Sequence, residues 1–243
     1  MRIVAIAGTI LLVFTSINLV YHVLRKPTEI FVHVNGALNK APAETWRRYA
    51  PLFREYSTAA ITPELLAALA QVEGAGNPVA RTYWRWRLSW KPFALYQPAS
   101  SGVGMYQMTD AAFAEARPFC IRNHVVVEDA CWFSGLYTRV LPSHAIELTA
   151  VYLDRNLGAI LAGRPNAKLN AQHKQELAAI IHLCGAGAAK ARSASRYLRT
   201  SAATPRPRPS ESAAGGPVQC FSEHCGRNEG SNPPHFDGGR FGN

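Results

Sequence analysis

Acidic residues are scarce in this chain: 16 Asp and Glu stand against 26 Lys and Arg, which gives a net charge of +10. Such a balance attracts polyanions, whether nucleic acid, anionic lipid or an acidic wall polymer. The basic residues form no block or stripe of the kind that follows a nucleic-acid backbone; they are spread out, with a looser cluster from Lys190 to Arg208. No nucleic-acid recognition motif accompanies them, so we expect no nucleic-acid partner.

The sequence also lacks the patterns of β-strands and of metal sites. Between Ala43 and Leu198 no run of residues alternates apolar with polar side chains, as half-buried strands do. We therefore expect an all-α domain or nearly so. His224, Cys225 and His235 lack any standard ligand spacing, so we expect no metal and no cofactor.

Full charges are absent from residues 3–24, an apolar run with scattered polar side chains. At about 1.5 Å per helical residue, this run is long enough to cross a hydrocarbon layer about 30 Å thick. A cleavable signal is usually shorter and carries a small-x-small site directly after it, whereas the nearest such sequence is at residues 41–43. We expect residues 1–26 to be an uncleaved signal anchor; a cleaved signal is the alternative. The flanking basic residues are nearly balanced, so charge alone leaves the orientation open.

Cysteine is sparse as well, with five in the chain. In an exported protein, Cys120 with Cys131 and Cys220 with Cys225 would close two short loops. Cys184 is then left over. Its apolar neighbours indicate a buried small hydrophobe.

The residues that are present divide the chain into four parts. These are the anchor (1–26), a short juxtamembrane connector (27–42), a core domain (43–200) and a tail (201–243) whose Pro, Gly, Ser and Arg content predicts disorder. In the core, apolar periodicity and end signals predict helices over 43–57 (divided or kinked at Pro51), 62–73 (with Thr62 as the cap and Pro63 at the first helical position), 110–116, 130–140, 144–161 and 171–184.

Glu73 is the most informative residue of these helices. Counting back from it by three, four, seven and eight gives Ala70, Leu69, Leu66 and Leu65, so the carboxylate lies on the apolar face. A carboxylate there is partly desolvated, which raises its pKa, as a proton donor near neutral pH requires. The alternative from periodicity alone is a Glu at a helix end that is solvated or paired with an Arg.

Two motifs around Glu73 resemble the signature of lytic transglycosylases of the soluble-transglycosylase, lysozyme-like family. Glu73-Gly74-Ala75-Gly76-Asn77-Pro78 resembles the family's helix-terminal Glu followed by Asn-Pro. Ser101-Gly102-Val103-Gly104-Met105-Tyr106-Gln107 resembles its Gly-Ala-x-Gly-Leu-Met-Gln turn, with matches at Gly104 and Gln107. A third, weaker match at residues 180–187 puts His182 where the family has the Tyr that helps to position the Glu, and Leu183 where it has an Asn.

The resemblance spans about residues 61–189 and implies a lysozyme-like helical fold that cleaves the MurNAc-GlcNAc β-1,4 bond of peptidoglycan. It implies that Glu73 protonates the leaving oxygen. As a carboxylate, Glu73 then takes a proton from the muramyl C6 hydroxyl, which closes a 1,6-anhydro ring without a second carboxylate. It further implies a saccharide cleft lined by Ser101, Gly102, Gly104, Tyr106, Gln107 and His182.

Together with the anchor, the resemblance implies an inner-membrane enzyme of a bacterial cell envelope. Its catalytic domain would lie in the periplasm, bind glycan strands and remodel the wall locally, with a secretion or conjugation machine as a partner. One alternative is a hydrolytic muramidase on the same fold, for which Asp110, Glu115, Glu128 and Asp129 are available as a second acid; we interpret Asp110 as a helix cap. Another alternative is a non-catalytic wall-binding or secretion-scaffold protein.

An aromatic segment separates the two motifs around Glu73. It contains Tyr83, Trp84, Trp86, Trp90, Phe93 and Tyr96. Such rings stack on sugars, fill a core or rest against a membrane. The sequence leaves these three alternatives open.

Overall fold

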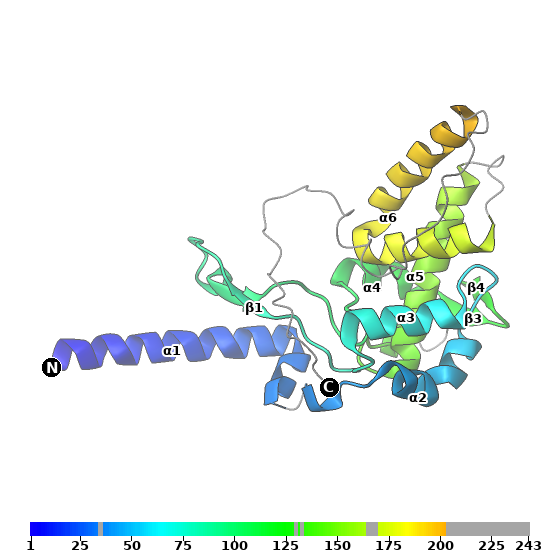
Figure 1. Ribbon diagram of the computed structural model, residues 1–243. Coiled ribbons are helices and arrows are strands. Elements are labelled where there is room, and N and C mark those ends of the chain that lie inside the picture. The colour runs from blue at the N-terminus through cyan, green and yellow to red at the C-terminus, as the bar shows by residue number, and fades with distance from the viewer. Residues whose placement is uncertain (34–35, 129–130, 132–133, 164–169, 203–243) are drawn as a thin grey trace, which may run out of the picture. The chain divides into compact units, whose positions relative to one another are not determined.

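A computed structural model describes residues 1–33, 36–128, 131, 134–163 and 170–202 (Figure 1). These residues are mostly helical, as predicted, with two short β-hairpins. Residues 1–193 form one compact unit and residues 194–243 a second. In the second unit, residues 194–202 are described and are helical. The predicted disorder of the tail therefore concerns mainly residues 203–243, which lie outside the described residues.

Helix α1, Arg2–Arg25, is apolar, and its 18-residue membrane-spanning candidate stretch has a mean hydropathy of 2.3 and is only 6% buried. Its Thr9 and Ser16 hydroxyls donate to carbonyls one turn earlier, so these groups need no solvent. In the described part of the chain, α1 is the one helix long and apolar enough to cross a membrane, a test that signal sequences also pass. The predicted N-terminal apolar helix, long enough for an anchor or a signal, is thus confirmed.

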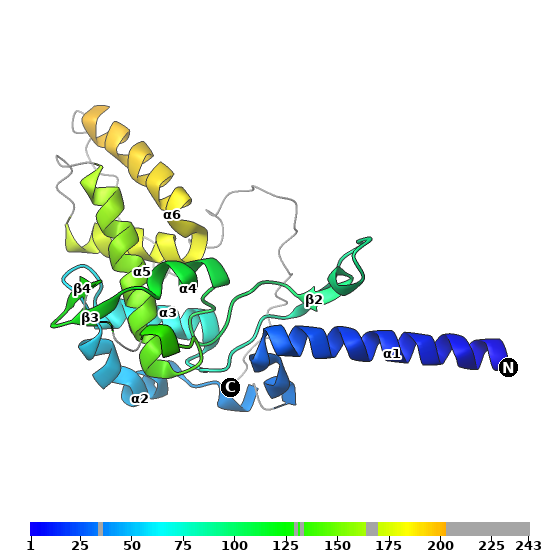
Figure 2. The same ribbon diagram turned by 180° about the vertical axis from the view of Figure 1, so that it is seen from behind.

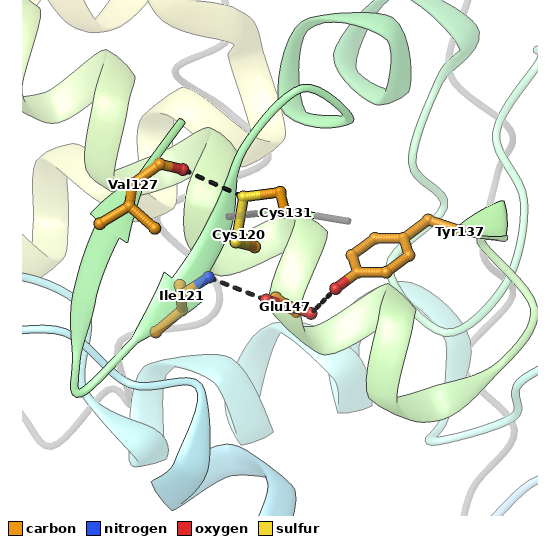
Figure 3. Close-up of a disulfide and its surroundings, with 6 residues drawn as sticks. All are labelled: Cys120, Ile121, Val127, Cys131, Tyr137 and Glu147. Atoms are coloured by element: carbon orange, nitrogen blue, oxygen red, sulfur yellow. Dashed lines mark hydrogen bonds between the residues drawn. A yellow bond between two sulfur atoms is a disulfide. The ribbon is translucent and has the colours of Figure 1, made fainter. Parts of the chain in front are cut away.

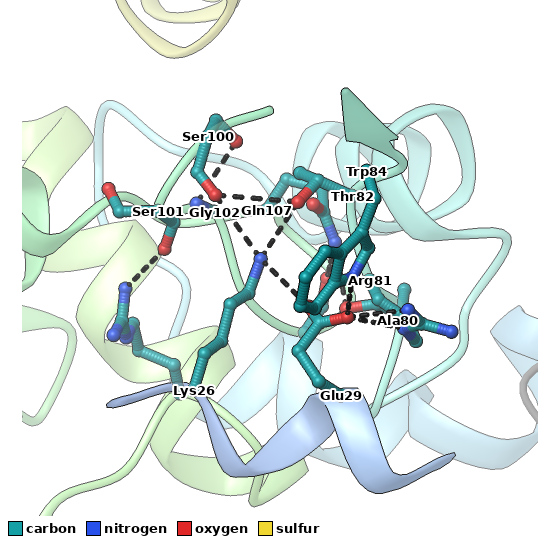
Figure 4. Close-up of polar contacts among 12 residues, drawn as sticks. Lys26, Glu29, Ala80, Arg81, Thr82, Trp84, Ser100, Ser101, Gly102 and Gln107 are labelled. Atoms are coloured by element: carbon teal, nitrogen blue, oxygen red, sulfur yellow. Dashed lines mark hydrogen bonds and ion pairs between the residues drawn. The ribbon is translucent and has the colours of Figure 1, made fainter. Parts of the chain in front are cut away.

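The connector after α1 is folded. It contains two short 3₁₀ helices, η1 (Pro27–His33) and η2 (Gly36–Leu38). The buried carboxylate of Glu29 anchors η1: it accepts from Arg81 Nε at 2.9 Å and from Trp84 Nε1 at 2.6 Å, and it lies 3.5 Å from Lys26 Nζ (Figure 4). A buried carboxylate is stable only when partners of this kind compensate its desolvation.

Five further α-helices follow in the described chain: α2 (Pro42–Glu55), α3 (Pro63–Gly74), α4 (Asp110–Ala116), α5 (Pro142–Ala162) and α6 (Ala171–Ala202). Helix α5 is the most buried of them, with Ile146, Leu148, Leu153 and Leu157 fully enclosed. Helices α2, α3 and α4 and strand β3 contact α5 (Figure 1, Figure 2). The core therefore forms around α5.

The two hairpins were not predicted. Strands β1 (Trp84–Trp86) and β2 (Tyr96–Pro98) pair antiparallel, as do β3 (Cys120–Arg122) and β4 (Val125–Val127). Each strand has three residues, too short for the alternation of side chains to be recognised in the sequence. The described part of the domain is therefore mostly helical, not all-α as expected.

One predicted helix, over residues 130–140, is wrong, and two other predictions concern a break within a helical run. The helix predicted over 43–57 is confirmed as α2, which is not divided at Pro51, because one missing N–H is tolerated while Tyr49, Ala50 and Phe53 hold the helix against the core. Among the described residues of 130–140, only the 3₁₀ turn η4 (Ser134–Leu136) is helical. The predicted end at Cys184 is confirmed, because the helical run α6 breaks at Gly185, where φ is +84°, and a further helical stretch follows the break.

The cysteines confirm one prediction and correct another. Cys120 and Cys131 form a disulfide that ties β3 to the segment before η4, which explains why no long helix forms there (Figure 3). Cys184 is also disulfide-bonded and only half-buried, so its interpretation as an unpaired buried hydrophobe is wrong. The predicted Cys220–Cys225 pair lies outside the described residues.

Replacing Gly74 by Ala should lower the free energy of unfolding by about 1–3 kcal/mol, because an added Cβ overpacks a filled site. At position 74 that Cβ would lie 2.7 Å from the Met105 Cα atom, and backbone cannot swing aside. Urea denaturation of the full chain in detergent, followed by circular dichroism, measures the change.

The matched control is Gly158→Ala in the C-terminal part of α5, where a Cβ meets nothing within 4 Å. Ala is the better helix former there, so this variant should gain up to about 1 kcal/mol. Equal stability of the two variants would contradict the close approach of α3 to Met105.

Candidate active site

The sequence fixes both ends of helix α3, and with them the position of Glu73. Thr62 caps the N-terminus by accepting from the Leu65 N–H at 3.3 Å, and Pro63 occupies the first turn, as predicted. At the other end Ala75 adopts a left-handed conformation, with φ +47°. Leu66 and Leu69 are buried on the face that leads to Glu73. Glu73 therefore lies in the last turn, next to the core.

The Glu73 carboxylate is half-buried, and burial raises its pKa above the ordinary value for Glu. Among the described residues no group donates a hydrogen bond to it and no cation lies within ion-pair distance. The negative end of the α3 dipole further disfavours its charged form. The predicted desolvated carboxyl is thus present, whereas the alternative of a Glu paired with an Arg is not observed among the described residues.

The second motif forms a tight turn against the end of α3. Gly74 lies so close to Met105 that any Cβ would collide with the Met105 backbone. The Gly104 N–H donates to the Ala80 carbonyl at 3.0 Å, in the segment that follows α3. Positive φ angles at Gly104 (+76°) and Gln107 (+46°) close the turn. The two motifs of the sequence thus meet in space.

Gln107 uses its side chain inside this turn. Its Nε2 donates to the Ala80 carbonyl at 3.0 Å and to the Gly104 carbonyl at 2.9 Å. Its Oε1 is buried and has no hydrogen-bond partner. The amide therefore holds the turn together, and only Oε1 is left to bind anything else.

Tyr106 and His182 belong to the packing beneath the turn. Tyr106 is fully buried, and its hydroxyl donates to the Leu66 carbonyl at 3.0 Å. The His182 ring meets the Tyr106 ring edge to face, 6.0 Å between centroids. Burial lowers the pKa of His182 to about 4, against an opposing hydrogen bond with the Tyr106 backbone. His182 is thus neutral at pH 7 and contacts Tyr106, with no hydrogen bond to Glu73.

The remaining predicted cleft residues lie around the turn. Ser101 is exposed; its carbonyl accepts from Arg139 Nη1 at 2.9 Å and its hydroxyl accepts from the Asp110 N–H at 3.1 Å. Gly102 is buried, and a Cβ there would lie 2.7 Å from the Gln107 carbonyl oxygen. Gly102 thus lets the turn close on itself.

The other carboxylates considered as a second acid are engaged or exposed. Asp110 lies 2.8 Å from Arg139 Nη2; the cap of α4 is Thr109, so the interpretation of Asp110 as the cap is wrong. Glu115 is exposed and accepts from Asn156 at 2.7 Å. Glu128 is exposed. Asp129 lies outside the described residues.

Arg139 and Glu147 were missed by the sequence reasoning. Arg139 Nη1 also donates to the Met108 carbonyl at 2.8 Å, so this side chain fixes the far end of the turn. Glu147, only 3% exposed, accepts from the Ile121 N–H at 2.8 Å and from the Tyr137 hydroxyl at 2.7 Å, and so ties the disulfide hairpin to α5 (Figure 3). These contacts join residues far apart in the sequence, which carries no local signal for them.

Neither of the two described cavities includes Glu73. One, of about 350 Å³, lies beside Tyr56, Arg122 and Glu147; the other, of about 290 Å³, lies at the end of α1. Among the described residues, no group of three or more His, Cys, Asp or Glu side chains is placed to hold a metal ion. Comparisons with protein-family models, with curated proteins and with solved structures found no match for this chain.

Replacing Glu73 by Gln should stabilise the chain at neutral pH. The pKa of Glu73 is higher in the folded state than in the unfolded state, so ionisation of this carboxyl destabilises the fold. Its contribution to the free energy of unfolding is complete below the unfolded-state pKa of about 4.3 and is lost as the pH rises through the folded-state pKa. The Gln variant avoids this loss. Urea denaturation in detergent over a pH series should show a gain at pH 7 that vanishes below about pH 4.

Glu64→Gln is the matched control, on the same helix. Glu64 is exposed in the first turn, where the helix dipole favours a negative charge, so this variant should show no gain. A Glu73→Gln variant no more stable than the parent chain at pH 7 would contradict the desolvation of Glu73.

His182 should show no titration between pH 5 and pH 8, because burial lowers its pKa to about 4. Proton NMR of the imidazole, assigned by comparison with His182→Gln, measures this. A chemical-shift step centred near pH 6.5, the ordinary value for His, would place His182 in solvent instead.

Proposed function

We propose that this chain cleaves the MurNAc-GlcNAc β-1,4 bond of peptidoglycan, with Glu73 as its acid and base. The observation that carries the proposal is the half-buried Glu73 carboxyl, with a raised pKa and no partner among the described residues. A carboxyl of this kind keeps its proton closer to neutral pH than an ordinary Glu and can give that proton to a leaving oxygen. Peptidoglycan is proposed as the substrate because the two motifs, which the fold brings together, resemble those of lytic transglycosylases.

The proposed reaction needs one carboxyl in two protonation states. Glu73 gives its proton to the glycosidic oxygen as the C–O bond breaks. The resulting carboxylate then takes the proton of the muramyl C6 hydroxyl, whose oxygen attacks the anomeric carbon and closes the 1,6-anhydro ring. Glu73 ends the cycle protonated again, and no water is consumed.

The state of the other carboxylates favours this one-acid route over hydrolysis. Hydrolytic glycosidases place a second carboxylate across the scissile bond. Asp110 is paired with Arg139, and the two oxygens of Glu147 accept from Ile121 and Tyr137. A hydrolytic muramidase therefore remains the alternative with less support.

The proposed fold and cellular location rest on the helical core and on α1. We propose a lysozyme-like domain tethered to the inner membrane by residues 3–24, acting in the periplasm on nearby glycan strands, with a secretion or conjugation machine as a partner. The apolar helix α1 supports the tether. The folded connector at Glu29 supports a domain held close to the membrane surface.

A second candidate is a wall-binding or secretion scaffold without turnover. One observation favours it: Tyr106 is buried and the Gln107 amide is turned inward, so two predicted sugar ligands serve the fold instead. A scaffold would keep the fold and bind glycan strands with no need for an acid at position 73.

Release of soluble fragments from dye-labelled sacculi distinguishes an enzyme with Glu73 as its acid from a scaffold without turnover. The detergent-solubilised chain should release dye, and Glu73→Gln should lower the rate by about 100-fold or more, because the acid is lost while the shape is kept. Glu64→Gln, on the same helix, should keep the parent rate. Release that is equal in the parent chain and in Glu73→Gln would contradict the role of Glu73, and no release from either would favour the scaffold.

A further inference from the structure

The β1–β2 hairpin exposes large apolar side chains at and near its tip. Trp86 is 75% exposed, and Leu88 and Trp90 are fully exposed. Exposed basic residues, Arg87 and Lys91, alternate with them. A cluster of exposed Trp and Leu side chains of this kind indicates a surface that binds an apolar partner, such as a membrane or another protein.

The hairpin is docked on α1. Asn18 Nδ2 donates to the Tyr96 carbonyl at 2.8 Å, and His22 Nε2 lies 2.9 Å from the Phe93 carbonyl. Asn18 and His22 are the buried residues of α1, and they lie one turn apart on one face. In a helix crossing lipid, both side chains would be costly unless covered and hydrogen-bonded. The hairpin supplies that cover.

The direction of the hairpin is the second observation. In both ribbon views it runs alongside the C-terminal half of α1 and away from the helical core (Figure 1, Figure 2). Trp84, at its base, contacts His22, with ring centroids 5.3 Å apart. A sugar-stacking surface for the proposed reaction would instead face the turn at residues 102–107. The direction therefore favours a membrane over a glycan strand.

The depth of the hairpin in a bilayer follows from the geometry of α1. Asn18 lies seven residues before the end of α1, about 10 Å along the axis. When α1 crosses a bilayer, a hairpin docked at that level lies at the boundary between acyl chains and headgroups. Trp side chains concentrate at this boundary, and long basic side chains reach from it to the phosphates.

The charge at the base of the hairpin is complementary to anionic lipid. A cavity of about 290 Å³ lies there, and its charged lining residues are Arg25, Lys26, Arg139 and Asp110. Lys26 and Arg139 face Glu29 and Asp110, whereas Arg25 donates to the Tyr21 hydroxyl and has no carboxylate partner in the described part of the chain. The cavity thus keeps positive charge at headgroup level.

We propose that residues 84–98 form a lipid-contacting hairpin that enters the membrane surface beside α1. Trp86, Leu88 and Trp90 lie among the upper acyl chains, and Arg87 and Lys91 lie at the phosphates. The protein then holds the bilayer at two elements, which fixes the rotation of α1 and the face that the domain turns to the wall. This inference rests on α1 crossing the membrane and is independent of the chemistry at Glu73.

Quenching by brominated lipid tests the proposal. The full chain is reconstituted in vesicles of phosphatidylethanolamine and phosphatidylglycerol with bromine high on the acyl chains, and Trp fluorescence is compared with unbrominated vesicles. The parent chain should be strongly quenched, and Trp86→Ser with Trp90→Ser should lose most of the quenched emission. Both side chains are exposed, so this variant should keep its helical circular dichroism.

Trp46→Phe is the control, since Trp46 stacks on Phe53 in α2; its quenched emission should match that of the parent chain. Glu73→Gln should also match, because no cleavage is measured. The proposal would be overturned if the fluorescence of Trp86 and Trp90 is not quenched by brominated lipid but is quenched by aqueous acrylamide. A spectral shift on adding soluble glycan fragments in place of lipid quenching would assign the hairpin to the substrate.

Discussion

The contact between Gly74 and the backbone of Met105 is the constraint on which the candidate site depends. Only a residue without a side chain allows the last turn of α3 to lie directly on the Ser101–Gln107 turn. This contact holds Glu73, one residue earlier, half-buried where burial raises its pKa. The turn itself is bent by a non-glycine residue with positive φ, Gln107. Such backbone strain persists only where surrounding contacts impose it, and it concentrates at functional sites.

A second set of contacts joins this turn to the end of α1. Glu29 pairs with Arg81, and Arg81 forms an isolated β-bridge with Val103 inside the turn. Lys26, the first residue after α1, donates to the Ser100 carbonyl at 3.3 Å (Figure 4). Separating the partners of a buried ion pair leaves an uncompensated buried charge, so these contacts disfavour arrangements in which the partners lie apart. The end of α1 and the turn beside Glu73 are thus held as one piece, which suits the proposed enzyme, since it would act on a wall at a set height above the membrane.

The sequence predicted what depends on local spacing. The Thr62 cap, the apolar face of α3 and the short loop closed by Cys120 and Cys131 all follow from residues a few positions apart, and the structure has them. Residues that meet only after folding were missed or misassigned. Arg139 reaches the turn from beyond the disulfide, and Tyr106, expected to meet sugar, fills the space beneath α3. Three-residue strands such as Trp84–Trp86 exist through their partners, so no pattern within them predicts pairing.

The most direct test of the central claim is mass spectrometry of muropeptides released from sacculi in water labelled with the heavy oxygen isotope. If Glu73 transfers the C6 hydroxyl proton and the ring closes internally, the parent chain gives 1,6-anhydromuramyl products without the label, and Glu73→Gln gives none. Reducing ends that carry the heavy isotope would show attack by water and contradict the one-acid mechanism. Anhydro products of equal yield from Glu73→Gln would show that another residue is the acid.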